Sequence, residues 1–149
     1  MNTLQLPENP SYPIEISLPV IWGDMDAFAH VNNTYYIRWC EAVRMVYMEA
    51  LNLKEHFSKT KIGPILARTE IDYFIPLSSP DMVTISMSVI QLGNTSFISK
   101  YRITSQAHQS KVAAQSQAVL VLIEYSTGQK VVLDETVRSK IIALENSKK

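Results

Sequence analysis

The sequence has few of the residues on which several common kinds of protein chemistry depend. Cysteine occurs once, as Cys40, so no intrachain disulfide can form. The chain has only four glycines, and no glycine-rich phosphate-binding loop is present. Its three histidines are scattered and give no metal-ligand spacing. Neither G-x-S-x-G nor H-E-x-x-H occurs. The sequence therefore predicts no metal site and gives no sign of a serine-hydrolase or zinc-protease centre.

Charge and hydrophobicity argue against nucleic-acid-binding, membrane and secreted proteins. Fourteen basic and fourteen acidic residues give a formal net charge of zero, which provides no overall attraction to nucleic acid or to an anionic membrane. No stretch approaches the roughly 18 apolar residues of a membrane helix. The N-terminus lacks a basic segment followed by an apolar one, as a signal peptide would have. We therefore expect a cytoplasmic protein that binds neither nucleic acid nor membrane.

Length and patterning predict one domain over residues 1–149. The first thirteen residues contain three prolines and predict an irregular arm, and residues 146–149 predict a polar tail. Apolar residues at spacings of three and four predict a helix of roughly five turns from residue 34 to about 53. That helix is apolar around most of its circumference, so we expect it to be largely enclosed.

Alternation of apolar and polar residues predicts a sheet. The last four strands have short connections, which favour antiparallel neighbours, and Asp134 can cap a final helix. The predicted fold class is α+β, with a five-stranded antiparallel sheet curled around the long helix and a short C-terminal helix. The predicted strands are 14–22, 65–75, 81–92, 95–105 and 111–125.

Polar residues concentrate where the first strand meets the long helix, in the stretch WGDMDAFAHVNN from Trp22 to Asn33. The first turn of a helix presents unpaired N–H groups and a partial positive charge, and Asn32 or Asn33 suits the N-cap position. Such an end can bind an anion or polarise a carbonyl oxygen. Asp26 lies close enough for its carboxylate to face the same space. The pair suits acyl hydrolysis, with the carboxylate attacking directly or activating water.

The same stretch also has a purely structural interpretation. Asp and Asn are common in strand–helix loops for conformational reasons alone. His30 can be a hydrogen-bonded structural histidine, and Asp24 can brace the loop through backbone N–H groups. Cys40 falls within the apolar helix pattern, where a buried side chain is expected rather than a nucleophile. The residues of the stretch leave the catalytic and structural interpretations open.

A family resemblance favours the catalytic interpretation. From about Glu15 to Leu144 the chain resembles the hot-dog-fold acyl-CoA thioesterases of the 4-hydroxybenzoyl-CoA thioesterase type. The segment WGDMDAFAHVNNTYYIRWCEAVR is similar to the family's D-x-D-x-x-x-H-V-N-N motif and the central helix that follows it. ILARTEIDYFIPLSSPDMVTI, GNTSFISKYRI and AVLVLIEYSTGQKVVL resemble the family's later strands.

The resemblance implies roles for the residues of the motif. Asp26 matches the family's catalytic carboxylate, acting as nucleophile or as general base toward water. Asn33 matches the position whose backbone N–H polarises the thioester carbonyl. His30 and the Asn33 side chain match groups that orient water, substrate or Asp26. Val31 and Asn32 complete the motif and are expected to contact substrate.

The implied function is hydrolysis of an acyl-CoA to free acid and coenzyme A, with no cofactor beyond the coenzyme A of the substrate. The family also implies a homodimer or homotetramer, with active sites at the dimer interface. Arg68 is a candidate for the phosphates of coenzyme A, although ordinary solvated charge is the alternative for it and for Lys54, Lys59 and Lys61.

The resemblance does not identify the acyl group, because the hydroxybenzoyl enzymes have a different sequence in place of H-V-N-N. Two other functions stay open. One is a non-catalytic acyl-thioester binding module. The other is a hydratase or dehydratase in which the histidine does the central work, and the D-x-D pattern argues against it.

Overall fold

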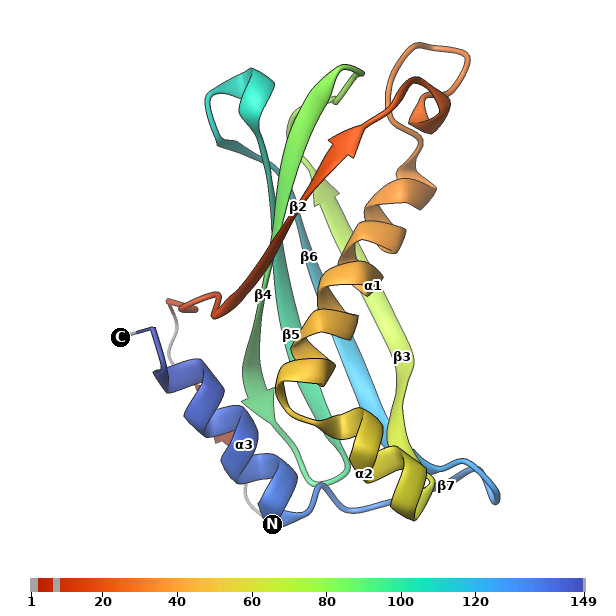
Figure 1. Ribbon diagram of the computed structural model, residues 1–149, viewed down its shortest axis with the longest axis vertical. Coiled ribbons are helices and arrows are strands. Elements are labelled where there is room, and N and C mark those ends of the chain that lie inside the picture. Colours follow the sequence, from red (N-terminus) through yellow and green to blue (C-terminus); the bar gives the residue numbers. More distant parts are fainter. Residues whose placement is uncertain (1–2, 7–8, 149) are drawn as a thin grey trace.

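A computed structural model describes residues 3–6 and 9–148 and contains one antiparallel sheet with a long helix across it (Figure 1). The main strands follow the order β2-β4-β5-β6-β3, and every pairing is antiparallel. Two short strands extend the sheet, β1 beside β4 and β7 beside β6. The strands are β1 (Leu4–Gln5), β2 (Ile14–Val20), β3 (Ile62–Tyr73), β4 (Asp81–Leu92), β5 (Ser96–Ser105), β6 (Lys111–Glu124) and β7 (Gln129–Lys130).

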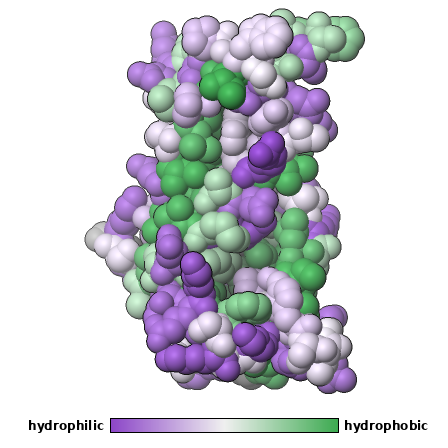
Figure 2. Space-filling view, turned by 45° about the vertical axis from the view of Figure 1, so that its right-hand side comes forward, coloured by the Kyte–Doolittle hydropathy of each residue, from purple (hydrophilic) through white to green (hydrophobic). Residues whose placement is uncertain are grey.

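Helix α1 (Asn33–Ala50) lies across one face of the curled sheet, which confirms the predicted fold class. The opposite side of the helix stays open, with Ile37 and Met45 exposed by 40% and 52%. Figure 2 brings the α1 and β3 side forward and shows hydrophobic side chains among hydrophilic ones there. The prediction of a largely enclosed helix is therefore wrong for the single chain, because the sheet covers one side only.

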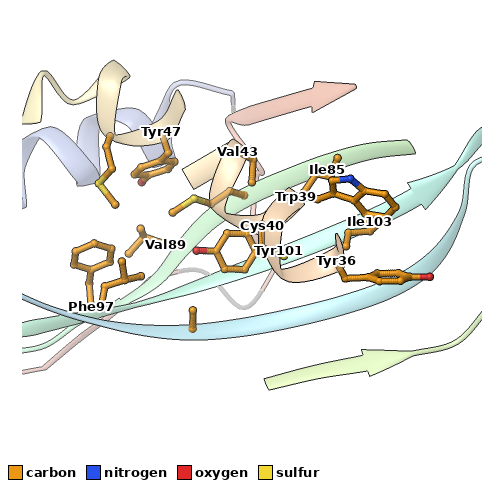
Figure 3. Close-up of a cluster of buried hydrophobic side chains, with 14 of the residues drawn as sticks. Tyr36, Trp39, Cys40, Val43, Tyr47, Ile85, Val89, Phe97, Tyr101 and Ile103 are labelled. Carbon is orange, nitrogen blue, oxygen red and sulfur yellow. The ribbon is translucent and has the colours of Figure 1, made fainter. Parts of the chain in front are cut away.

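The buried side of α1 forms the core together with the sheet. Tyr36, Trp39 and Val43 come from successive turns of the helix and are nearly or fully buried. Ile85 of β4 and Ile103 of β5 face them from the sheet (Figure 3). Because residues three and four apart share one helix face, this contact fixes the rotation of α1 about its axis and the position of its N-terminus.

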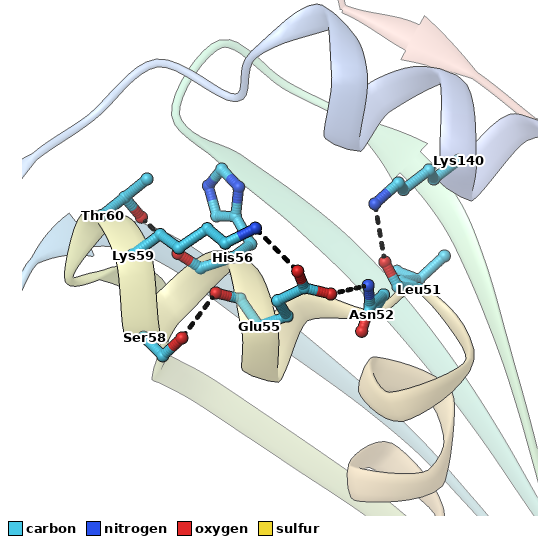
Figure 4. Close-up of polar contacts among 8 residues, drawn as sticks. All are labelled: Leu51, Asn52, Glu55, His56, Ser58, Lys59, Thr60 and Lys140. Carbon is cyan, nitrogen blue, oxygen red and sulfur yellow. Dashed lines mark hydrogen bonds and ion pairs between the residues drawn. The ribbon is translucent and has the colours of Figure 1, made fainter.

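The predicted helix to residue 53 is in fact two helices, since α1 is followed by α2 (Leu53–Thr60). Asn52 between them has a φ of 57°, in the left-handed region, so the chain turns there and begins α2 in a new direction. The Asn52 side chain donates to Glu55 at 2.6 Å, which holds this start (Figure 4). The last helix, α3 (Glu135–Asn146), begins at the predicted cap: the Asp134 carboxylate accepts from the Val137 N–H at 2.8 Å.

Other boundaries also differ from the predictions. The first strand ends at Val20 rather than 22, because a 3₁₀ turn (η1, Trp22–Asp24) follows it. A second 3₁₀ turn (η2, Gln106–His108) follows β5. The arm expected to be irregular contains β1, and the tail expected from residue 146 begins at the last residue of α3. Residues 1, 2, 7 and 8 of that arm, and residue 149 of that tail, lie outside the described residues. No helix in the described part of the chain is long and apolar enough to cross a membrane.

A buried carboxylate closes a gap at the edge of β4. The pairing of β4 with β2 ends at Met87, and its pairing with β1 covers only Gln91 and Leu92. In this gap the Val89 N–H donates to Glu145 Oε1 at 2.7 Å, and the Tyr47 hydroxyl donates to the same oxygen at 2.6 Å. Burial raises the pKa of Glu145 above its ordinary value. Helix α3 is thereby tied to both the sheet and α1.

We predict that Glu145→Gln makes the free energy of unfolding less dependent on pH. A glutamine keeps the accepting oxygen but cannot ionise. In the wild type the folded state holds the proton to higher pH than the unfolded state, so its free energy of unfolding falls as pH rises above about 4.5. The difference in free energy of unfolding between Glu145→Gln and the wild type should grow by up to about 1.4 kcal/mol per pH unit until the pH passes the pKa of Glu145 in the folded state.

Denaturant titrations at a series of pH values measure this difference, with the exposed Glu15→Gln as the control. A difference in free energy of unfolding that is constant between pH 4 and 7 would contradict the raised pKa of Glu145. Glu145→Ala should instead cost about 1–3 kcal/mol at all these pH values, because it leaves buried donors unpaired.

Candidate active site

Asn32 is the N-cap of α1. Its side-chain oxygen accepts from the Thr34 N–H at 3.0 Å and from the Thr34 hydroxyl at 2.9 Å. Its backbone carbonyl accepts from the Tyr35 N–H at 3.0 Å. Of the two predicted caps, the structure therefore selects Asn32 and makes Asn33 the first residue of the helix.

One backbone N–H at this helix end is left without an acceptor among the described residues, and it belongs to Asn33. The N–H of Val31 donates to the Leu77 carbonyl at 2.8 Å, and that of Asn32 donates to the Asp24 carbonyl at 2.9 Å. The next N–H, of Thr34, is held by the cap. The Asn33 N–H is thus free to bind an outside oxygen, at the positive end of the helix dipole.

The loop before α1 is held by backbone bonds and by Asp24. The Asp24 side chain is buried, at 6% exposure, and accepts from the Ile21 N–H at 3.0 Å, which confirms its predicted bracing role. Asp26 donates its N–H to the His30 carbonyl at 2.9 Å, and its own carbonyl accepts from the Ala29 N–H at 3.0 Å. Ala29 has a φ of 62°, so a tight turn lies between Asp26 and His30.

This turn exposes the Asp26 carboxylate. Its Oδ1 accepts from the Phe28 N–H at 2.8 Å, which fixes the side-chain direction. Asp26 lines a hollow of about 420 Å³ together with Trp22, Met25 and Ala29. Trp22, which lines this hollow, and Phe28, two residues after Asp26, are both more than four-fifths exposed.

His30, Val31 and Asn33 meet in a second hollow of about 290 Å³. The end of β3 and the segment after it form its other wall, through Tyr73 and Phe74. The structure thus brings three of the predicted residues together and places Asp26 in a separate hollow of the same loop. Asn32 does not line either hollow, because its side chain is used in the cap.

The segment between β3 and β4 supports the loop from the other side. The Ser78 hydroxyl donates to the Ala29 carbonyl at 2.8 Å, and the Ser79 N–H approaches the Met25 sulfur at 3.4 Å. With the Leu77 bond to Val31, these contacts join the motif to a part of the chain about fifty residues away. The loop is therefore positioned by tertiary contacts as well as by its own turns.

The hollow of His30 and Asn33 also contains Tyr36 and Tyr73, which lie in the predicted helix over 34–53 and the predicted strand over 65–75 and were not among the predicted site residues. Their rings meet edge to face at 5.0 Å between centroids. Burial, with a smaller effect of Tyr73, raises the pKa of Tyr36 to about 12, so its hydroxyl stays protonated at neutral pH. One signal was available: Tyr36 lies three residues after Asn33, and so on the same side of the helix.

A family model described as the thioesterase-like superfamily matches residues 20–141, which include the whole motif. The chain belongs to the thioesterase-like superfamily. It is 29% identical over 127 residues to a 1,4-dihydroxy-2-naphthoyl-CoA hydrolase of Rippkaea orientalis, covering 84% of this chain and 92% of that protein. It is 26% identical over 117 residues to the long-chain acyl-CoA thioesterase FadM of Escherichia coli, covering 78% and 88%.

A solved structure agrees with this family. A thioesterase from Thermus thermophilus, crystallised with coenzyme A and Zn, superposes with a TM-score of 0.79 at 27% identity and covers 91% of this chain and 96% of that one. Together these findings confirm the predicted family, the hot-dog fold and the enzyme class of thioester hydrolase.

Other candidate residues of this thioesterase-like chain are not part of the motif's two hollows. Arg68 lies on β3 and pairs with Glu70 at 2.7 Å, and Lys59 pairs with Glu55 at 2.7 Å (Figure 4). Exposed pairs of this kind contribute little stability. Cys40 is buried, and burial raises the pKa of its thiol to about 12, which agrees with the predicted core role.

A second cluster superficially resembles a catalytic triad. The Ser105 hydroxyl donates to Asp81 and contacts His108 Nδ1. In a triad the histidine lies between the acid and the nucleophile, whereas here the buried serine lies between the other two. Ser105 also accepts from the His108 N–H, as the cap of η2. Across the described ranges, no three His, Cys, Asp or Glu side chains are grouped as metal ligands would be.

We predict that Asn32→Ala lowers the free energy of unfolding by about 1 kcal/mol, because it removes the cap that holds the Thr34 N–H. Chemical denaturation measures the change. Asn33→Ala is the matched control, since its side chain does not cap α1 and its exposed position tolerates alanine. Equal losses in the two variants would contradict the assignment of the cap.

Proposed function

We propose that the chain is an acyl-CoA thioesterase that hydrolyses its substrate to a free acid and coenzyme A. One observation carries the proposal: the Asn33 N–H has no acceptor among the described residues and begins the helix at the end of the loop that presents Asp26. The names of the relatives add support, since both act on coenzyme A thioesters. Their acyl groups differ, so the proposal from relatives extends only to the coenzyme A thioester.

In this mechanism the thioester oxygen accepts a hydrogen bond from the Asn33 N–H, and the dipole of α1 stabilises the negative charge that develops there. Sulfur overlaps poorly with the carbonyl, which makes the carbon electrophilic and lets the thiolate leave readily. A carboxylate and one polarising group are therefore sufficient for the reaction. His30 borders the same hollow as Asn33 and is placed to orient water or substrate.

Asp26 can act in either of two ways. As a nucleophile its oxygen bonds to the carbonyl carbon and the C–S bond breaks. Water then hydrolyses the resulting anhydride, and the thiolate takes up a proton. As a general base Asp26 takes a proton from the water that attacks the carbonyl, and passes it to the leaving thiolate. Label in Asp26 after a single turnover in ¹⁸O water would establish the nucleophilic route with water attacking the Asp26 carbonyl, because the general-base route places the label in the product acid.

The working form in our proposal is a dimer joined through β3. This strand has twelve residues and pairs with β6 on one side, and no described strand pairs with its other edge. Leu66 and Tyr73 on β3 are exposed apolar side chains. A long edge strand with apolar side chains is a template for pairing with another chain. Two copies related by a two-fold axis would cover both edges and the open side of α1.

We predict that Asp26→Asn lowers kcat/KM for acyl-CoA hydrolysis by about 100-fold or more, because amide oxygen neither attacks nor takes a proton. Coenzyme A release, followed with a thiol reagent over a panel of acyl-CoAs, measures the loss. An asparagine can still accept from the Phe28 N–H, so the loop should keep its shape. Glu15→Gln, which removes a carboxylate from the exposed side of β2, is the control. Near-normal turnover by Asp26→Asn would refute the role of Asp26, and turnover by neither protein would refute the function.

We also predict that the wild type has about twice the chain mass of 16.9 kDa, or four times it, in solution. Leu66→Asp places a charge at the exposed β3 surface and should shift the population toward monomer. Light scattering after gel filtration, over a range of concentrations, measures both. A wild type that is monomeric at all concentrations would exclude the dimer.

A further inference from the structure

A cavity of about 540 Å³ lies at the far end of α1 from the catalytic motif. It is bounded by the last turns of α1, by α2, by the start of β3 and by the residue after β6. Its lining is mainly apolar, and its charged members, Glu49 and Lys54, are exposed. The apolar side chains include Met45, Met48, Leu53, Phe57, Pro64 and Tyr125.

The shape of this cavity is built into the chain. The rings of Phe57 and Tyr125 meet edge to face at 5.2 Å between centroids, and the Tyr125 hydroxyl donates to the Pro64 carbonyl at 2.8 Å. Gly63 packs against the two rings, and a Cβ there would come within 3.1 Å of the Phe57 ring. Left-handed residues, Asn52 and Lys61, set both ends of the short helix that carries Phe57. The cavity is therefore an open, preformed apolar site.

The cavity lies far along α1 from the motif of the same chain. Fifteen residues of α1 separate Asn33 from Met48, a length of about 22 Å along the helix. The strand β3 runs between the same two regions: Gly63 and Pro64 border the cavity, whereas Tyr73 at the other end borders the hollow of His30 and Asn33. The start of β3 therefore borders the cavity, and its end borders the hollow of the motif.

Antiparallel pairing of two β3 strands about their middle places the start of one strand beside the end of the other. The cavity of one protomer then adjoins the Asn33 hollow of its partner. Both are open, and both have apolar walls supplied by β3 or the residues after it. A thioester bound at one helix end would have its acyl group directed along the strand edge into the cavity of the other protomer.

We infer that this cavity binds the acyl group of the substrate held at the second protomer's helix end, and that it selects apolar acyl chains of medium to long length. The inference rests on the proposed function. The volume lies within the range of small-molecule sites, roughly 300–1,000 Å³, and its apolar lining suits a hydrocarbon rather than a polar acyl group. Met45 and Met48 have flexible side chains that adapt to chains of different shape.

Filling the cavity tests the inference. Met45 is half exposed, so Met45→Trp can add a ring without disturbing the core. The ratio of kcat/KM for lauroyl-CoA to that for butanoyl-CoA should fall about tenfold or more, since each lost methylene contact costs about tenfold or more. Met45→Ala enlarges the cavity, so it should raise the ratio of kcat/KM for acyl-CoAs longer than lauroyl-CoA to that for butanoyl-CoA. The matched control is Val46→Trp, one residue along the helix, which does not line the cavity and should leave the ratio unchanged.

An unchanged ratio in Met45→Trp would overturn the inference and leave the thioesterase proposal intact. Absence of turnover by the wild type on both substrates would instead overturn the proposed function. A fall of equal size in Val46→Trp would also overturn the inference, because the effect would then come from helix packing and not from the cavity.

Hybrid dimers test whether the cavity serves the partner's helix end. Two differently tagged proteins are co-expressed, one with Asp26→Asn and an intact cavity, the other with intact Asp26 and Met45→Trp. Roughly half of the wild-type lauroyl-CoA activity should return in the hybrid, since one of the two equivalent sites of a two-fold dimer then has both parts. Lauroyl-CoA activity no higher than that of the Met45→Trp homodimer would show that each chain uses its own cavity and would overturn the inference.

Discussion

The first turn of an α-helix cannot satisfy its own N–H groups, and the stretch from Trp22 to Asn33 is arranged around that constraint. The carbonyls of Leu77 and Asp24 take the two N–H groups before the helix, and the Asn32 side chain takes the one after Asn33. Within the described part of the chain, the Asn33 N–H is left without an acceptor because each adjacent donor is already satisfied. The oxygen site in our proposal would need no dedicated side chain for this reason.

The position of that N–H depends on packing far from it. The buried side of α1 belongs to one core with the sheet, so the N-terminus cannot move without disturbing that core. At the other end of the core, Glu145 joins α3 to Tyr47 of α1 and to the open edge of β4. A carboxylate that is costly to bury is used here to satisfy a strand edge and to anchor the helix.

The elements were predictable where one periodicity extends over many residues, as in α1 and in β3 to β6. The helix α2 was not, because the apolar spacing continues through Leu51 and Leu53 while the backbone turns at Asn52. A left-handed asparagine has no periodic signal. The motif identified Asp26, His30 and Asn33 as neighbours in sequence. It could not show that His30 and Asn33 share a hollow with Tyr73, since that contact depends on how β3 ends beside α1.

The incomplete cover of α1 and the free edge of β3 have one cause. Helix α1 packs mainly on the β2 and β4 part of the sheet, and α2 meets the start of β3, so the middle of β3 stays exposed. The apolar residues of β3 and the outer side of α1 are exposed together for this reason, and the same gap opens hollows at both ends of the strand. A second copy meeting this edge would cover the exposed surface and bring unlike ends together. In that arrangement the surface left exposed on the single chain is also the surface on which its proposed site is assembled.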